Sequence, residues 1–158
     1  MVTPIKLNHL AIPYLAIFVF IFGGIITNEG VAWYYSLTLP VWNPPTVLVA
    51  VMWAVIYFCA ATSLLLIWNT LPRNSRFYWI LSGFVFSTVL NAVWSILFFH
   101  FHLMFAAIMC ATILELSVFA LMALTFTASK KAAFLLIPYF TWVLFAMYLQ
   151  YTVLTLNS

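Results

Sequence analysis

Long apolar runs dominate this chain and limit what it can fold into. Of its 158 residues, 68% are apolar and seven are charged, five Lys or Arg and two Asp or Glu. A soluble globular domain is about half apolar and about a quarter charged, so these charges cannot cover a water-facing surface. A disordered chain is also excluded, because disorder requires low hydrophobicity. The sequence therefore predicts an integral membrane protein.

Five apolar stretches are long enough to cross a bilayer, which takes roughly 20 residues of helix. Between the first two lie the polar triplet at 28–30 and Pro40, Pro44 and Pro45, which would break a helix interior. We therefore expect one domain over residues 1–158, with a lid loop at 28–45 and helices at about 9–27, 46–69, 77–99, 103–128 and 132–154. The runs are apolar on all sides, which excludes a transmembrane barrel, and the first lacks a signal-peptide cleavage site. The predicted fold class is all-α, an integral membrane bundle of five transmembrane helices.

The basic residues predict the orientation of this bundle. With five spans, all of them fall on one side of the membrane: Lys6, Arg73, Arg76, Lys130 and Lys131. Short cytoplasmic loops gather Lys and Arg, so we expect the N-terminus in the cytoplasm and the C-terminus outside. The formal net charge of +3 is too small for a surface that tracks phosphates, which excludes nucleic acid as a partner.

Few side chains are suited to catalysis or metal binding. Glu29 is expected to be a solvated loop residue, whereas Glu115 lies deep in an apolar helix, where a carboxyl group is costly. We interpret Glu115 as protonated or hydrogen-bonded to a neighbouring helix, with a ligand or proton role as the alternative. His100 and His102 stand two apart at a membrane edge and are interpreted as interfacial, so no metal site is expected. The cysteines lack metal-site spacing and are interpreted as reduced packing residues: Cys59 and Cys110.

Aromatic residues make up 20% of the chain and gather around the lid loop. Trp33, Tyr34, Trp42 and Trp53 lie close together in the sequence, in a segment that also holds three prolines. An aromatic belt at the membrane interface explains some of these rings. A loop that is stiffened by proline and rich in flat rings is also preorganised to cover a flat, apolar ligand.

Two later helices can each direct an indole to a common interior. Asn91 and Trp94 share one helical face, and Trp142 and Ala146 share another. A buried amide needs hydrogen-bond partners in lipid, so Asn91 either holds helices together or lines a pocket. A stripe of small and polar residues repeats every four positions and allows a close helix contact, within the bundle or across a homodimer: Gly83, Ser87, Asn91 and Ser95.

Three motifs occur in order along the chain. The first, W-Y-x-x-L…P-x-W-x-P-P…W-x-x-x-Y, runs from Trp33 to Tyr57, and N-x-x-W-S-x-x-F-F and P-Y-x-x-W-x-x-x-A follow from Asn91 and Pro138. Together they resemble the translocator protein or tryptophan-rich sensory protein (TspO) family in its bacterial form. The resemblance implies a five-helix, commonly dimeric bundle in a bacterial cell membrane. It also implies a pocket under the first loop for tetrapyrroles such as protoporphyrin IX, for sterols, and for isoquinoline carboxamide or benzodiazepine-type ligands, with light-dependent porphyrin breakdown.

The resemblance also implies roles for individual residues. It gives the catalytic role to Trp53 and Trp142, as indoles that face the porphyrin. The ligand-binding residues that it implies are Tyr34, Pro44, Trp53, Asn91, Trp94, Cys110, Trp142 and Ala146. No separate cofactor is expected, because the porphyrin is itself ligand or substrate.

The chain departs from the family pattern at several positions. Leu39 stands where many relatives carry Lys, Cys110 where bacterial relatives often carry an acid, and Gln150 where Asn is usual. No Lys or Arg follows Tyr151, so the sterol pattern is incomplete and weaker sterol binding is expected.

The expected function is that of a receptor-like membrane protein that binds tetrapyrroles and promotes their light-dependent degradation. The alternatives are a transporter of porphyrins or sterols across the membrane, and a sensory protein whose contacts with a partner change when ligand binds. Transport sites in known folds use broken helices and internal repeats, and the sequence shows neither clearly.

Overall fold

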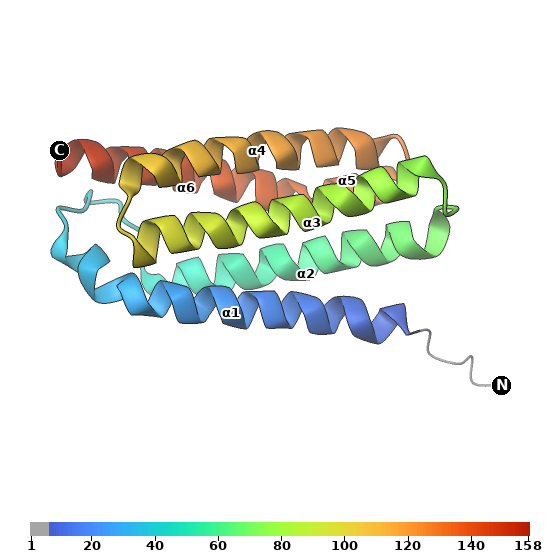
Figure 1. Cartoon of the computed structure of the whole chain (residues 1–158), viewed down its shortest axis with the longest axis horizontal. Coiled ribbons are helices and arrows are strands. Elements are labelled where there is room, and N and C mark those ends of the chain that lie inside the picture. The colour runs from blue at the N-terminus through green and yellow to red at the C-terminus, as the bar shows by residue number, and fades with distance from the viewer. Residues whose placement is uncertain (1–6) are drawn as a thin grey trace.

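The computed structural model describes residues 7–158, which form an up-and-down helical bundle without strands in that range. Its elements are α1 (Asn8–Ser36), α2 (Thr46–Thr70), α3 (Ser75–Ser95), the π-helix η1 (Ile96–His100), α4 (Met104–Phe126), α5 (Lys130–Phe134) and α6 (Ile137–Leu156). Five segments are long and apolar enough to span a membrane, with α3 and η1 forming one and α5 and α6 another. The predicted five-helix transmembrane fold is confirmed. Consecutive spans run in opposite directions, so α1 begins at one end of the bundle and α6 finishes at the other (Figure 1).

Local sequence signals set several of the helix ends. The Asn74 side chain accepts a hydrogen bond from the Phe77 backbone amide at 3.2 Å and so caps the start of α3. Ser129 caps α5 in the same way, through the Ala132 amide at 3.3 Å. The chain then breaks before α6, which carries Pro138 in its first turn, where the missing amide hydrogen costs little. The expected single helix at 132–154 is therefore two helices in the structure.

The first helix is longer than the sequence predicted. It continues through Ser36, so the expected end at residue 27 is wrong and the lid loop covers residues 37–45, not 28–45. A helix of 29 residues measures about 43 Å, which exceeds the roughly 30 Å of hydrocarbon. About 20 residues from Asn8, enough to cross that thickness, the chain reaches the Asn28-Glu29-Gly30 triplet, and the helix continues beyond it. Gly30 permits a close helix contact, since a Cβ at this position would collide with the Phe99 backbone.

The small-residue stripe on α3 faces the inside of the bundle. A Cβ on Gly83 would lie 2.9 Å from the Leu121 Cδ1 atom on α4. The Ser87 hydroxyl is 3.0 Å from that of Ser117, also on α4. The homodimer interpretation of this stripe is therefore wrong, although homodimer formation itself stays a prediction. Because Gly83 and Ser87 contact α4 and Asn91 bonds to Tyr57 on α2, a dimer interface has to use another face.

The charged residues separate along the bundle axis. The connections that carry Arg73, Arg76, Lys130 and Lys131 lie at the end where α1 begins (Figure 1). Lys6 lies outside the described residues. The Arg73 guanidinium covers the rings of Trp68 and Phe77, with centroids at 4.7 and 4.0 Å, which fixes this cation at the membrane edge. The opposite end holds the lid loop. This separation agrees with the expected topology, and the orientation in a cell membrane stays a prediction.

Candidate ligand-binding site

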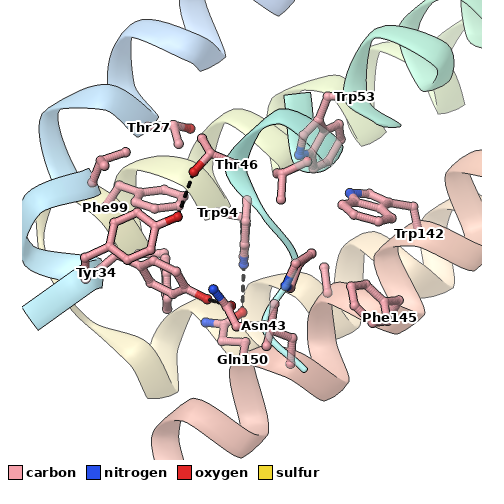
Figure 2. Close-up of a pocket in the computed structure, with 17 residues that line it drawn as sticks. Thr27, Tyr34, Asn43, Thr46, Trp53, Trp94, Phe99, Trp142, Phe145 and Gln150 are labelled. Carbon is pink, nitrogen blue, oxygen red and sulfur yellow. Dashed lines mark hydrogen bonds between the residues drawn. The ribbon is translucent and has the colours of Figure 1, made fainter. Parts of the chain in front are cut away.

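A cavity of about 110 Å³ lies under the lid loop, at the end of the bundle where α6 finishes. We call it the lid cavity. Parts of α1, α2, α3 and α6 surround it, and Figure 2 shows their side chains converging on one space. Six of the expected ligand-binding residues line it: Tyr34, Pro44, Trp53, Trp94, Trp142 and Ala146. Among the described residues, no charged side chain lines this cavity, so it suits a mainly apolar ligand.

Hydrogen bonds fix both ends of the lid loop. The Tyr34 hydroxyl donates to Asn43 Oδ1 at 2.6 Å, and the Tyr35 hydroxyl lies 2.7 Å from that of Thr46 (Figure 2). These bonds hold the last turn of α1 against the end of the loop. A two-residue Pro44-Pro45 step then leads directly into α2.

The loop is also held from the opposite side, by α6. Asn157 Oδ1 accepts a hydrogen bond from the Thr38 backbone amide at 2.9 Å, and Asn157 Nδ2 donates to the Thr38 carbonyl oxygen at 3.0 Å. The Trp42 ring stacks on Tyr148, with centroids 5.3 Å apart and planes 12° apart. Thr38, Trp42, Tyr148 and Asn157 are all exposed. The lid is therefore attached to α6 through contacts that lie at the surface of the bundle and outside its core.

Three indoles form the walls of the lid cavity. Trp53 approaches from α2, Trp94 from α3 and Trp142 from α6 (Figure 2). Trp94 Nε1 donates to Gln150 Oε1 at 2.9 Å, and Gln150 Nε2 donates to the Met104 carbonyl oxygen at 3.1 Å. The Trp94 indole is thus fixed by a buried amide that is itself fixed by α4. The Trp53 ring lies 6.5 Å from that of Trp94, between centroids.

A second cavity, of about 240 Å³, lies between α1, α2 and α3, beside the lid cavity. We call it the side cavity. It shares Trp53, Trp94 and Phe99 with the lid cavity, and Asn91 lines it. Asn91 Nδ2 donates to the Tyr57 hydroxyl at 2.8 Å.

Comparisons with known proteins identify the family of this chain. A family model described as the TspO/MBR family matches residues 10–156. The chain belongs to the TspO/MBR family. It is 31% identical to "Tryptophan-rich protein TspO" of Bacillus cereus, over 79% of this chain and 80% of that protein. It is 30% identical to "Protein CrtK" of Rhodobacter capsulatus, over 85% and 83%, and 34% identical to "Translocator protein" of Ovis aries, over 80% and 75%.

Within this TspO/MBR-family bundle, Cys110 lies apart from the other expected site residues. It is buried on α4, and its thiol contacts the Leu90 carbonyl oxygen at 3.4 Å. It lines neither the lid cavity nor the side cavity. This position agrees with the packing role that its sequence context indicates.

The acidic residues and histidines lie outside both cavities. Glu115 is buried on α4, and neither of its carboxyl oxygens has a hydrogen-bond partner among residues 7–158. The expected bond to a neighbouring helix is therefore not seen. Glu29 Oε2 lies 3.5 Å from His100 Nδ1 on an exposed surface, and the His102 ring stacks on Trp33 at 4.0 Å. These contacts join α1 to the α3–α4 connection.

Several residues of the site were not predicted as site residues, although Tyr57, Phe98 and Phe99 belong to the motifs quoted from the sequence. Asn43 fixes the lid, Tyr57 binds Asn91, and Phe98 and Phe99 line the lid cavity. Gln150 was noted as a departure from the family pattern and not as a site residue. Its spacing carried a usable signal, since it lies one helical turn beyond Ala146 on the same face.

Proposed function

We propose that this protein binds tetrapyrroles such as protoporphyrin IX under the lid loop and promotes their light-dependent degradation. The observation that carries the proposal is the set of three indoles around an uncharged cavity, covered by a loop that exposed contacts hold to α6. Flat rings of a ligand stack favourably on indoles, by on the order of 1 kcal/mol per contact beyond burial. Isoquinoline carboxamide and benzodiazepine-type ligands, which are also flat and apolar, fit the same description.

Size and charge determine how a tetrapyrrole would enter. Drug-sized ligands occupy pockets of roughly 300–1,000 Å³, which is larger than the lid cavity of about 110 Å³. A tetrapyrrole in the lid cavity would therefore also extend into the side cavity of about 240 Å³, whose lining includes the same Trp53 and Trp94. It would enter by a transient outward movement of the lid loop, whose contacts with α6 are exposed. Leu39 leaves the loop without a cation at that position. The carboxylates of the porphyrin would accordingly point to the water at the open end of the bundle.

The photochemistry needs little from the protein beyond position. A porphyrin absorbs visible light itself, so the difficult chemistry belongs to the ligand. Trp53 and Trp142 would hold the porphyrin beside their own oxidisable indole rings and away from bulk water, with dioxygen as the terminal oxidant. A transporter of porphyrins or sterols stays an alternative without a specific structural observation behind it.

A titration in the dark tests the binding step. Protoporphyrin IX added to the purified protein should quench tryptophan fluorescence and saturate at one ligand per chain. Ala146→Leu fills the lid cavity and should weaken binding about tenfold or more, because overpacking of a filled site costs roughly 1–3 kcal/mol. Ala120→Leu, on the exposed face of α4, is the matched control. Equal affinities for the two variants would contradict a site under the lid.

A further inference from the structure

A groove of about 220 Å³ lies on the outer side of the bundle, between α1, α2 and α3. We call it the outer groove. Among the described residues, none that lines it also lines the lid cavity, and it shares only Tyr57 with the side cavity. Several of its wall residues are more than half exposed, among them Leu15, Val85 and Val89. The groove is therefore open to the bilayer, and it is distinct from the proposed tetrapyrrole site.

The walls of the outer groove suit a hydrocarbon chain. Apart from Thr88 and Tyr57 they are aliphatic or aromatic, and the Thr88 hydroxyl already donates to the Phe84 carbonyl oxygen at 2.8 Å. From Leu81 to Val89, α3 advances eight residues along the groove, about 12 Å. One leaflet of hydrocarbon measures about 15 Å, half of the whole core. The groove therefore covers most of the depth of one leaflet.

The three walls of the groove continue by one helical turn to the end of the bundle where α1 begins (Figure 1). Four positions beyond the last wall residue of each helix, on the same face, stand Asn8 on α1, Trp68 on α2 and Phe77 on α3. Phe77 belongs to a core cluster against which Trp68 packs together with the wall residues Leu64 and Leu81. Trp68 and Phe77 thus form the rim of the groove at this end.

A cation lies on this rim. The Arg73 guanidinium covers the Trp68 and Phe77 rings, at 4.7 and 4.0 Å from their centroids, so it is positioned before any ligand binds. The chain has two acids, of which Glu29 lies near the lid end of α1 and Glu115 is buried on α4. Among the described residues, no carboxylate pairs with Arg73. An open apolar groove therefore ends at a fixed positive charge that the protein does not neutralise.

We propose that the outer groove and Arg73 form a binding site for an anionic phospholipid. One acyl chain lies in the groove and runs from the rim toward Tyr57, with its outer side facing the bilayer. The phosphate pairs with the Arg73 guanidinium one helical turn, about 5.4 Å, beyond the end of the groove. Arginine suits this role because its planar group can bind phosphate through two parallel hydrogen bonds. The test requires no porphyrin, so this proposal and the proposed function can fail separately.

Photolabelling tests the location of this site. The probe is a phosphatidylglycerol that carries a diazirine in one acyl chain, added to the protein in detergent micelles and followed by peptide mapping. The labelled residues should lie on the three helix faces that line the outer groove, at 12–19, 57–64 and 81–89. Ala16→Leu fills part of the groove and should reduce this labelling about fivefold or more. Ala120→Leu, the same substitution on the exposed face of α4, should leave the labelling unchanged.

Competition tests the role of Arg73. Unlabelled phosphatidylglycerol should displace the probe at about fivefold lower concentration than zwitterionic phosphatidylcholine, the factor expected for one cation near an anionic lipid. Arg73→Gln should abolish this preference, and Arg73→Lys, which keeps the charge, should retain it.

Arg76→Gln is the matched control for this charge. It removes a cation from the first turn of α3, but position 76 lies on the opposite side of that helix from the groove walls, so the preference should remain. An equal loss of preference in Arg73→Gln and Arg76→Gln would overturn the proposal, because the basic end of the bundle would then attract anionic lipids without a defined site. Labelling spread evenly over the lipid-facing surfaces would overturn it as well.

Discussion

The contact between Asn157 and the lid loop gives the sharpest prediction about ligand exchange. Two hydrogen bonds from the Asn157 amide reach the Thr38 backbone, at 2.9 and 3.0 Å, while a third stays within α6, to the Val153 carbonyl oxygen. A hydrogen bond contributes about 0.5–1.5 kcal/mol net. Because Thr38 and Asn157 are exposed, the lower part of that range applies. Asn157→Ala should therefore destabilise the closed lid by about 1–2 kcal/mol.

This loss should appear in rates more than in affinity. A change of 1–2 kcal/mol raises the population of the open lid by roughly 5- to 30-fold, since 1.4 kcal/mol corresponds to a factor of ten. The clamp holds the lid in both the free and the bound protein, so its loss should accelerate ligand entry and exit together. Stopped-flow quenching of tryptophan fluorescence by protoporphyrin IX measures both rate constants. The dissociation constant should change by less than about threefold.

Two matched variants keep this test specific. Thr155→Ala removes a hydroxyl whose hydrogen bond stays within α6, to the Thr152 carbonyl oxygen, and should leave both rate constants unchanged. Asn157→Asp retains the acceptor for the Thr38 amide and loses the donor, so its rates should be intermediate. Unchanged rate constants in Asn157→Ala would refute the clamp, and so would weaker binding with an unchanged entry rate.

Three further predictions follow from packing and charge. Gly30→Ala should lower stability by about 1–3 kcal/mol, because the added Cβ collides with the Phe99 backbone. Gly23→Ala adds a Cβ in open space and should stabilise the protein or leave it unchanged. Thermal unfolding measures both effects. Gln150→Leu leaves the Trp94 indole N–H and the Met104 carbonyl oxygen unpaired, and should lower the stability of the protein by about 1–3 kcal/mol for each group. It should also shift the tryptophan emission spectrum. An unaltered spectrum would mean that Trp94 is held by other contacts. Single cysteines are placed near residues 74 and 157 in a variant that lacks Cys59 and Cys110. They should react with an impermeant thiol reagent from opposite sides of sealed vesicles, and labelling of both from one side would contradict the five-span topology.

The number and class of the helices could be predicted from the sequence for a simple physical reason. The hydrocarbon thickness fixes how long an apolar run has to be, so five runs mean five spans. Helix ends are less constrained, because a helix can continue beyond the hydrocarbon. The polar triplet at 28–30 indicates where the apolar run ends, and the helix continues to Ser36. Gly30 looked like a turn residue, although it serves a contact with Phe99, 69 positions away in the sequence, which local sequence does not reveal.

A site residue could be predicted where its side chain reaches the cavity from a helix face that the sequence spacing reveals. Trp94, Trp142 and Ala146 could be placed because helical spacing shows which residues share a face. Asn43 and Gln150 could not, because each acts through a partner on another element, Tyr34 and Trp94 respectively.

Cys110 shows the limit of transfer by position. It was included because of where it stands in the family pattern, but the structure turns its thiol to the α3 backbone. A position in a family motif fixes the helix and approximate depth of a residue. It does not fix which neighbour the side chain contacts.

Illumination of the bound porphyrin tests the central proposal most directly. Protoporphyrin IX bound to the parent protein is exposed to visible light in the presence of dioxygen, and its absorption spectrum is recorded over time. The account predicts that Trp53→Phe/Trp142→Phe consumes the porphyrin at least about tenfold more slowly than the parent, equivalent to about 1.4 kcal/mol in the barrier, while dark binding weakens only modestly. Trp79→Phe changes a residue on α3 that is 68% exposed and outside the site, and this variant should match the parent. Equal consumption by the double variant and the parent would contradict the account, because the two indoles would then be packing residues around a porphyrin that degrades by itself.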